Sequence, residues 1–178
     1  DWDTLNLFQR KLKAEFGTAA RWIDELAVRR LYYFIAICRA CNLRPGSEML
    51  NLRWKHITWV DSTQKPGQKI PVIDVTTGKV GRRVAVGSHG CEHHFREWRL
   101  FLRTKLPTDF GLDHDYLFPH KDGRPVRQEV LGLLFKQKLA KHDMTHNREG
   151  DKITLYSIRS CEINYMIRHF FINLSTQL

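Results

Sequence analysis

Three short segments place basic residues where they could act on a phosphate group. In the first, Arg44 stands at a break between two predicted helices, and Glu48 follows one helical turn later. An arginine at such a break can point its guanidinium group into a cleft, and a carboxylate there can accept two of its hydrogens in a fixed geometry. A surface arginine in a loop would have the same spacing, so this segment alone leaves both interpretations open.

The second segment is the glycine-containing turn Gly78-Lys79-Val80-Gly81-Arg82-Arg83. A lysine at the tip of a hairpin reaches beyond its sheet and can meet a phosphate as a mobile point charge. Arg82 and Arg83 add positive charge beside Lys79, which makes them candidate DNA-binding residues. An ordinary solvated turn also commonly carries lysine.

The third segment, Leu155-Tyr156-Ser157-Ile158-Arg159-Ser160, opens the last predicted helix. Arg159 lies near the start of this helix, where the free backbone N–H groups also favour an anion. Tyr156 lies three residues earlier, so its hydroxyl can share the same face. Tyr156 could equally be a core residue, which is the more common environment of a tyrosine.

The hydrophobic pattern predicts the elements that position these segments. Apolar residues at helical spacing predict a central helix from Trp22 to about Arg39, ended by the segment around Asn42 and Pro45. Ser47 is expected to cap a short second helix. Three strands are expected at 56–60, 70–75 and 83–86, and further helices at 93–106, 128–142 and from about 155 to 166. The fold class is therefore a mostly helical α+β domain with a small three-stranded antiparallel sheet at one edge.

Composition and charge favour a folded domain that meets a polyanion. Hydrophobic residues make up 42% of the 178 residues, and the formal net charge is +10. A basic domain of this size most often binds nucleic acid, although a basic surface can also serve solubility alone. Cys38 and Cys41 are expected to be buried free thiols in a reducing cytoplasm. No apolar run approaches the length of a membrane span.

A cluster of histidines offers a different chemistry. His89, Cys91, His93 and His94 could in principle bind zinc and support a metal-dependent hydrolase. Their spacing matches no closed structural zinc site, so we expect a chance cluster and no metal or cofactor.

Taken in order, the three basic segments resemble the tyrosine recombinase (phage integrase) family. The run R-P-G-S-E-M-L-N-L-R-W-K-H-I, from Arg44 to Ile57, is similar to the first arginine box of that family. A G-K-x-G-x-R hairpin and a late Tyr-Ser-Ile-Arg box follow in the same order. The resemblance spans about Trp22 to Ile167, and the first box is its most specific part.

The resemblance implies a function in site-specific DNA recombination, the integration or excision of a mobile element. Such enzymes cut and rejoin strands through a 3′-phosphotyrosyl link without metal or cofactor. Arg44 and Arg159 would clamp the scissile phosphate, Lys79 would protonate the leaving 5′-oxygen, and Tyr156 would stand where histidine or lysine is usual. Glu48 would support Arg44. The expected partner is double-stranded DNA, bound as a tetramer by the full-length protein, with no membrane.

The resemblance also implies that residues 1–178 are a single catalytic-domain fragment. The family's N-terminal DNA-binding domain and the segment with its nucleophilic tyrosine would lie outside the chain, so this fragment alone is expected to be inactive. A bacterial or phage-encoded protein of the cytoplasm, associated with the nucleoid, is implied. The alternatives are a non-catalytic DNA-binding module of the same fold and the metal-dependent hydrolase.

Overall fold

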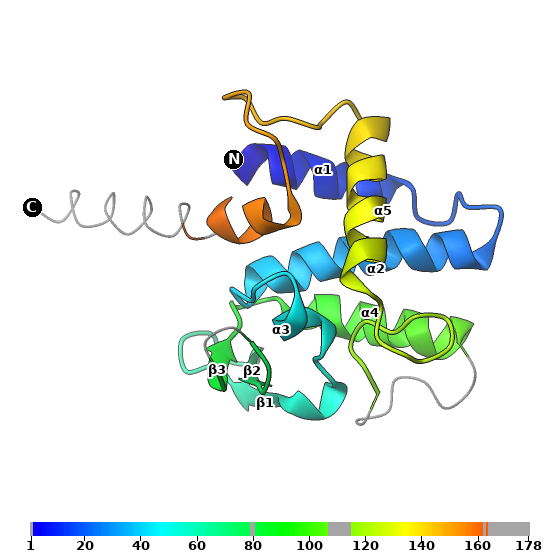
Figure 1. The fold of residues 1–178 in the computed structure, drawn as a ribbon. Helices are drawn as coiled ribbons and strands as arrows, with labels where there is room; N and C mark the ends of the chain where they lie inside the picture. Colours follow the sequence, from blue (N-terminus) through cyan, green and yellow to red (C-terminus); the bar gives the residue numbers. More distant parts are fainter. Residues whose placement is uncertain (1, 79–80, 107–114, 162, 164–178) are drawn as a thin grey trace, which may run out of the picture.

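The computed structural model describes residues 2–78, 81–106, 115–161 and 163 (Figure 1). Its elements, in chain order, are α1 (Trp2–Ala14), α2 (Trp22–Ala40), α3 (Ser47–Leu50), the 3₁₀ turn η1 (Trp54–His56), β1 (Ile57–Asp61), β2 (Lys69–Val75), β3 (Arg83–Val86), α4 (Glu92–Lys105) and α5 (Gln128–Lys141). Residues 155–161 and 163 are also helical. The expected mostly helical α+β class is therefore confirmed. None of the described helices is long and apolar enough to cross a membrane.

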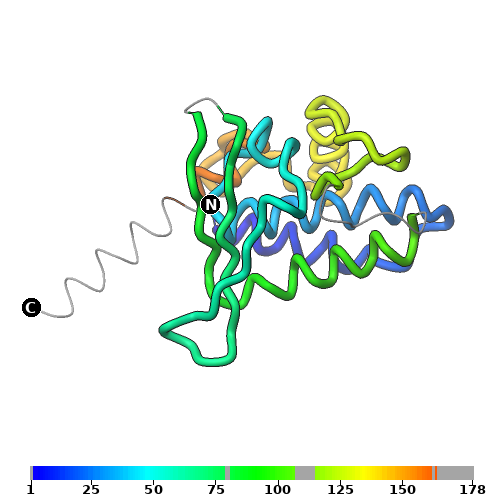
Figure 2. The backbone as a smooth tube through the Cα atoms, turned by 90° about the horizontal axis from the view of Figure 1, so that it is seen from below, coloured from blue at the N-terminus to red at the C-terminus, as the bar shows by residue number. Residues whose placement is uncertain are grey.

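Helix α2 is the centre of the core. It contacts α1, α4 and α5, which lie around it in both backbone views (Figures 1 and 2). Every residue from Leu31 to Cys38 is buried. This run is apolar on all sides, and a helix of that kind is stable only when neighbours cover it completely. The C-terminal end of α2, which leads to Arg44, is thus held in a rigid position.

The three strands form one antiparallel sheet in the order β1-β2-β3, as the sequence predicted. Ile73 lies opposite Ile57 on one side and Ala85 on the other. Ile73 and Ala85 are buried, whereas Val84 and Val86 on the other face of β3 are exposed. The sheet stands at one end of the helical layer (Figure 2) and carries the β2–β3 turn toward α3.

Several local expectations were wrong. The sequence pattern predicted no helix before Trp22, yet α1 buries Leu5, Phe8 and Leu12, which recur at helical spacing. Ser47 was expected as a helix cap, but it is the first helical residue and Gly46 occupies the cap position without a side-chain hydrogen bond.

Two apolar residues that belong to the predicted helices are exposed. Trp22 is 47% exposed at the start of α2, and Val130 is 42% exposed on α5. In both cases the apolar pattern along the chain continues past the part of the helix that a neighbouring element covers.

Candidate active site

Arg44 is positioned by the way α2 ends. Asn42 adopts a positive φ of 47°, its N–H donates to the Arg39 carbonyl at 3.2 Å, and the Leu43 N–H donates to the Cys38 carbonyl at 3.0 Å. These two bonds form the Schellman motif, in which a left-handed residue, often glycine or asparagine, closes the helix. Leu43 is fully buried, which anchors the chain next to Arg44.

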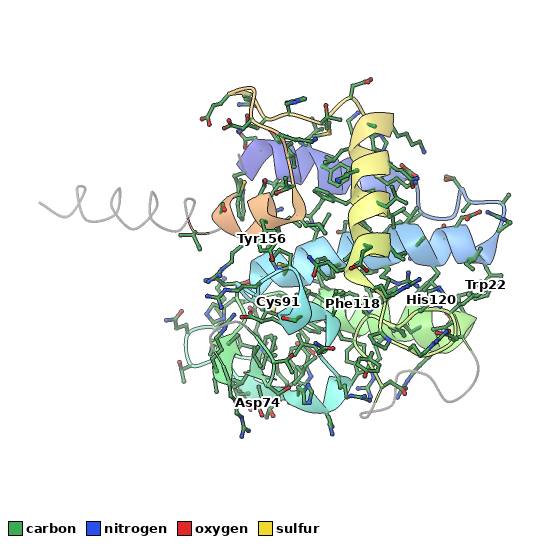
Figure 3. All side chains as sticks on the ribbon, in the orientation of Figure 1. Trp22, Asp74, Cys91, Phe118, His120 and Tyr156 are labelled. Carbon is green, nitrogen blue, oxygen red and sulfur yellow. The ribbon has the colours of Figure 1, made fainter. Side chains whose placement is uncertain are left out.

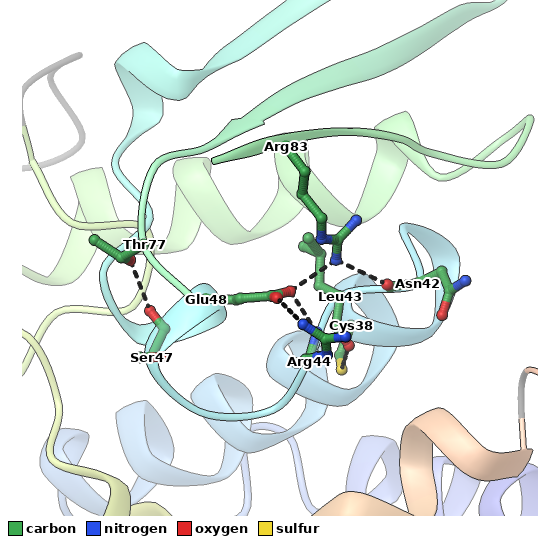
Figure 4. A network of polar contacts seen from close by, with 8 residues as sticks. All are labelled: Cys38, Asn42, Leu43, Arg44, Ser47, Glu48, Thr77 and Arg83. Carbon is green, nitrogen blue, oxygen red and sulfur yellow. Dashed lines mark hydrogen bonds and ion pairs between the residues drawn. The ribbon is translucent and has the colours of Figure 1, made fainter. Parts of the chain in front are cut away.

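The Glu48 carboxylate is the hub of the site (Figure 4). Its Oε1 accepts from Arg44 Nη1 at 3.1 Å, and its Oε2 accepts from the Arg44 backbone N–H at 3.0 Å. Arg83 Nη2, from β3, donates to Oε2 at 2.7 Å and to the Asn42 carbonyl at 3.3 Å. One buried acid therefore holds two arginines from segments that lie far apart in the sequence.

The electrostatics keep Glu48 ionised. Burial by itself would raise the pKa of the Glu48 carboxyl, but the hydrogen bonds from Arg83 and from the Arg44 backbone outweigh burial and lower this pKa. Glu48 is 2% exposed, while the side chains of Arg44 and Arg83 are each 28% exposed. The Glu48 carboxylate is thus inaccessible to solvent, whereas part of each arginine side chain remains accessible to a ligand.

The β2–β3 turn packs directly onto this hub. A Cβ atom at Gly78 would lie 2.9 Å from both Cγ and Oε1 of Glu48, so only glycine fits there. Thr77 Oγ1 also donates to the Ser47 carbonyl at 3.3 Å. The turn that bears the predicted Lys79 is therefore fastened to α3 at its first residues. Lys79 itself lies outside the described residues.

The late helix approaches the segment between Arg44 and α3. Gly46 has a φ of +147°, and a Cβ atom there would lie 3.9 Å from the Tyr156 hydroxyl and 3.5 Å from Gln128 Oε1. Tyr156 is 60% exposed, so it is not a core residue (Figure 3). The Tyr156 hydroxyl thus lies beside the segment that begins with Arg44.

Arg159 shares the helix of Tyr156 and follows it by three residues, so the two lie on one face. Its side chain is half-buried, and its Nε is buried without a hydrogen-bond partner in the described part of the chain. A buried donor without an acceptor is costly unless a ligand supplies one.

The two arginines of the β2–β3 turn differ. Arg82 is exposed and forms an ion pair with Asp74, with N–O distances of 2.9 and 2.6 Å. Arg83 instead points inward to Glu48. The alternation along β3 explains this, because Arg83 lies two residues before buried Ala85 and therefore on the same face. The sequence analysis nominated both for DNA binding and missed the contact of Arg83 with Glu48.

Gln128 was not nominated at all. It is the first residue of α5 and lies beside Gly46, although α5 begins more than 80 positions later in the sequence. A polar residue at the start of a helix is too common to mark a site, so no signal in the sequence alone could have identified it.

The side chains of the histidine–cysteine cluster do not converge on one point, although the rings of His93 and His94 lie 3.8 Å apart. His89 contacts Ser62 and Gln64, and His94 packs against aromatic rings of α2. Cys91 is buried beside Cys41. Within the described ranges, no three side chains of metal-ligating type come together. The hydrolase alternative therefore has no ligand set in this part of the chain.

Three solved recombinase structures resemble this chain. Two are XerH site-specific recombinase bound to difH substrates, before and after cleavage, with TM-scores of 0.61 and 0.63 at 17% and 19% identity. The alignments cover 94% and 93% of this chain, and 43% and 41% of the two XerH chains. The third is XerA recombinase, with a TM-score of 0.53 at 18% identity. That alignment covers 92% of this chain and 49% of the XerA chain.

Sequence comparison adds nothing to these likenesses, since no family model and no curated protein sequence matches the chain. The chain spans less than half the length of the recombinases that it resembles. Structural likeness at this level of identity establishes a shared fold. The chain therefore has the catalytic-domain fold expected from its three basic segments, the fold seen in the site-specific recombinases XerH and XerA.

Proposed function

We propose that this chain is part of the catalytic domain of a tyrosine recombinase, which cuts and rejoins DNA strands in site-specific recombination. One observation carries the proposal. Two segments more than 100 residues apart, one with Arg44 and one with Tyr156 and Arg159, meet at Gly46 on a fold shared with recombinases. This approach brings the helix that carries Arg159 up to the segment that begins with Arg44.

The chemistry follows from the charges. A tyrosine oxygen attacks the scissile phosphorus, a bond to the 3′-phosphate forms, and the bond to the 5′-oxygen breaks. Negative charge builds up on the non-bridging oxygens in the transition state, and Arg44 and Arg159 would stabilise it there. The leaving oxygen needs a proton, which the Lys79 ammonium group would donate. Tyr156 would donate a hydrogen bond to the same phosphate.

The remaining roles are supporting ones. Glu48 orients Arg44 and does not touch the DNA, and Arg83 orients Glu48. The proposal takes the attacking tyrosine from a position after Leu178, as the family resemblance implies. It also includes binding of double-stranded DNA, assembly of the full-length protein as a tetramer on DNA, and integration or excision of a mobile element in a bacterial or phage context.

The proposal is tested by trapping the covalent intermediate. A version of the protein extended past Leu178 to its natural end is incubated in EDTA with a nicked substrate that carries its recombination site. We expect a protein–DNA adduct that survives a denaturing gel. Arg44→Ala or Arg159→Ala should reduce the adduct by at least about a hundredfold, the usual cost of removing one transition-state charge donor.

The 178-residue chain is the matched control, and it should bind DNA without forming an adduct. Its affinity should fall steeply as salt rises, because the contacts with phosphate release counterions. No adduct from the extended protein on its own site would favour the alternative, a non-catalytic DNA-binding module. An adduct that appears only with a divalent metal would contradict the mechanism.

A further inference from the structure

A second buried charge lies away from the candidate active site, between α2 and α5. The side chain of Arg30 is 5% exposed and borders a cavity of about 190 Å³. The rest of the cavity wall is almost entirely apolar and includes Ala27, Val126, Val130, Leu133 and Leu134.

Arg30 has no partner within the described part of the chain. Its Nε is buried without an acceptor, and its guanidinium group forms no hydrogen bond or ion pair there. Burial alone lowers the pKa of the guanidinium group to about 10, and no acid lies close enough to counter it. The other buried charges, Glu25, Arg39 and Glu48, all have partners.

The helix above this cavity is apolar on two sides. Leu131, Phe135 and Leu139 bury the inner side of α5. On its outer side Val130 is 42% exposed and Leu133 is 58% exposed. Within the described residues, the aliphatic side chains on this outer side are therefore left open to a partner.

The buried charge of Arg30 and the exposed aliphatic side of α5 point to a single kind of ligand. An uncompensated buried charge is strongly destabilising, and a carboxylate is the acceptor whose geometry matches the guanidinium fork. A phosphate would leave the exposed aliphatic side chains of Val130 and Leu133 uncovered. An acidic side chain between apolar neighbours would satisfy both the charge and the exposed aliphatic surface.

We propose that the cavity beside Arg30 is a docking site for a segment of a partner protein that carries Asp or Glu between apolar residues. The acid would form an ion pair with Arg30, and its apolar neighbours would cover Val130 and Leu133. This site is separate from the candidate active site and does not depend on the recombinase assignment.

The first test uses two matched probes, the capped tripeptides acetyl-Leu-Glu-Leu-amide and acetyl-Leu-Gln-Leu-amide. Nuclear magnetic resonance follows the Arg30 Nε–H and the methyl groups of Val130 and Leu133 in the 178-residue chain. We expect both sets of signals to shift on addition of the Glu peptide. Its dissociation constant should be at least about tenfold lower than that of the Gln peptide, which is about the effect of one charge-assisted contact. Equal affinities, or no shift up to about 10 mM peptide, would overturn the proposal.

Two further probes separate the carboxylate from other anions. Inorganic phosphate and a duplex DNA are titrated under the same conditions. Neither should shift the Arg30 Nε–H with an affinity that matches the Glu peptide. If either one does, this face binds nucleic acid phosphate and the proposed docking site is wrong.

The second test compares neighbouring arginines. Arg30→Met should raise the thermal midpoint by about 2–4 °C, because it removes an unpaired buried charge, and should abolish the preference for the Glu peptide. Arg29→Met is the matched control. It should lower the midpoint, because Arg29 pairs with Glu25 and lies over the rings of Phe16 and Phe101.

A surface variant guards against poor folding of Arg30→Met. Leu133→Asn should leave the midpoint nearly unchanged and still weaken binding of the Glu peptide several-fold. A midpoint lowered by Arg30→Met would show that Arg30 has a purely structural role. Peptide binding that is insensitive to Leu133→Asn would show that the peptide does not cover this surface, and would overturn the proposed docking site.

Discussion

Glu48 and Arg30 are both charged and nearly inaccessible to solvent, but their surroundings are opposite. Glu48 accepts hydrogen bonds from Arg44 and Arg83, whereas Arg30 has no partner within the described residues. Burying a charge is costly, and a paired charge recovers much of that cost through its hydrogen bonds. The comparison indicates that the Glu48 cluster is complete in the free protein, while the Arg30 cavity requires a partner from outside.

A partly buried acid shows what a purely structural cluster looks like. Glu15, just after α1, accepts from Lys138 and from His142 on the far side of the core. Burial would raise the pKa of Glu15, but these neighbours lower it. The cluster joins the end of α1 to α5, and Lys141, whose side chain is 57% exposed, pairs with Glu15 as well. Glu48 instead holds Arg44 in the segment that the Tyr156 hydroxyl approaches.

The largest expected loss of stability is at the cluster of Glu48, Arg44 and Arg83. Glu48→Ala should cost about 3–5 kcal/mol of unfolding free energy, because it leaves two partly buried arginines without their acid. Urea unfolding of the 178-residue chain measures it. The exposed pair between Arg21 and Asp24 supplies the control, since Asp24→Ala should change the unfolding free energy far less than Glu48→Ala. Equal costs would mean that Glu48 is not a hub.

A somewhat smaller effect is expected where the β2–β3 turn meets Glu48. Gly78→Ala places a methyl group 2.9 Å from the Glu48 side chain, and overpacking of this kind typically costs about 1–3 kcal/mol. In the extended protein the variant should also lower adduct formation, because the turn carrying Lys79 must shift. Gly132→Ala, where the added methyl group would meet Leu155 Cδ1 at an ordinary contact distance of 3.9 Å, should be neutral or stabilising by up to about 1 kcal/mol. Similar losses in both variants would remove the case for close packing at Gly78.

The smallest predicted effect is a loss of stability at mildly acidic pH, which we assign to the partly buried His94. Burial, with positive neighbours, lowers the pKa of His94 to about 4, below its ordinary 6.5. The folded state then binds fewer protons than the unfolded state, so stability is complete above pH 6.5 and falls as the pH drops toward 4. Because His94 is partly exposed, we expect a loss of only about 1 kcal/mol.

His94→Phe should abolish this fall, which unfolding at pH 7, 5.5 and 4.5 would measure. The lowered pKa values of Glu48 and Glu15 cost stability only below about pH 4.5, where these carboxylates become protonated. If His94→Phe leaves the loss between pH 6.5 and 4.5 unchanged, another group is responsible.

The sequence predicted the local features of the site better than its contacts. The break after Arg39, the strands and the pairing of Arg44 with Glu48 follow from spacing along the chain, and the structure shows each of them. The contact between Arg83 and Glu48 depends on how β3 lies against α3, so spacing alone could not indicate it. Strand alternation with Ala85 could have predicted that Arg83 points inward.

Other features depend on packing between elements far apart in the sequence. The sequence could not show that Arg30 is without a partner among the described residues, because a cation on an apolar helix often pairs with an acid from another element. This becomes evident only from the packing of α5 against α2. The position of Gln128 beside Gly46 arises in the same way. Conversely, α1 was missed although Leu5, Phe8 and Leu12 carry its pattern, because short polar stretches dominate the segment around them.

The central claim is that Arg44 and Arg159 bind one phosphate. The most direct test is a crystal structure of the 178-residue chain with orthovanadate, a tetrahedral oxyanion that takes the place of the scissile phosphate. The account predicts one vanadate ion contacted by both guanidinium groups, with the Tyr156 hydroxyl beside it and Glu48 still bound to Arg44. Vanadate held by Arg44 alone, with Arg159 directed to another face of the molecule, would contradict it.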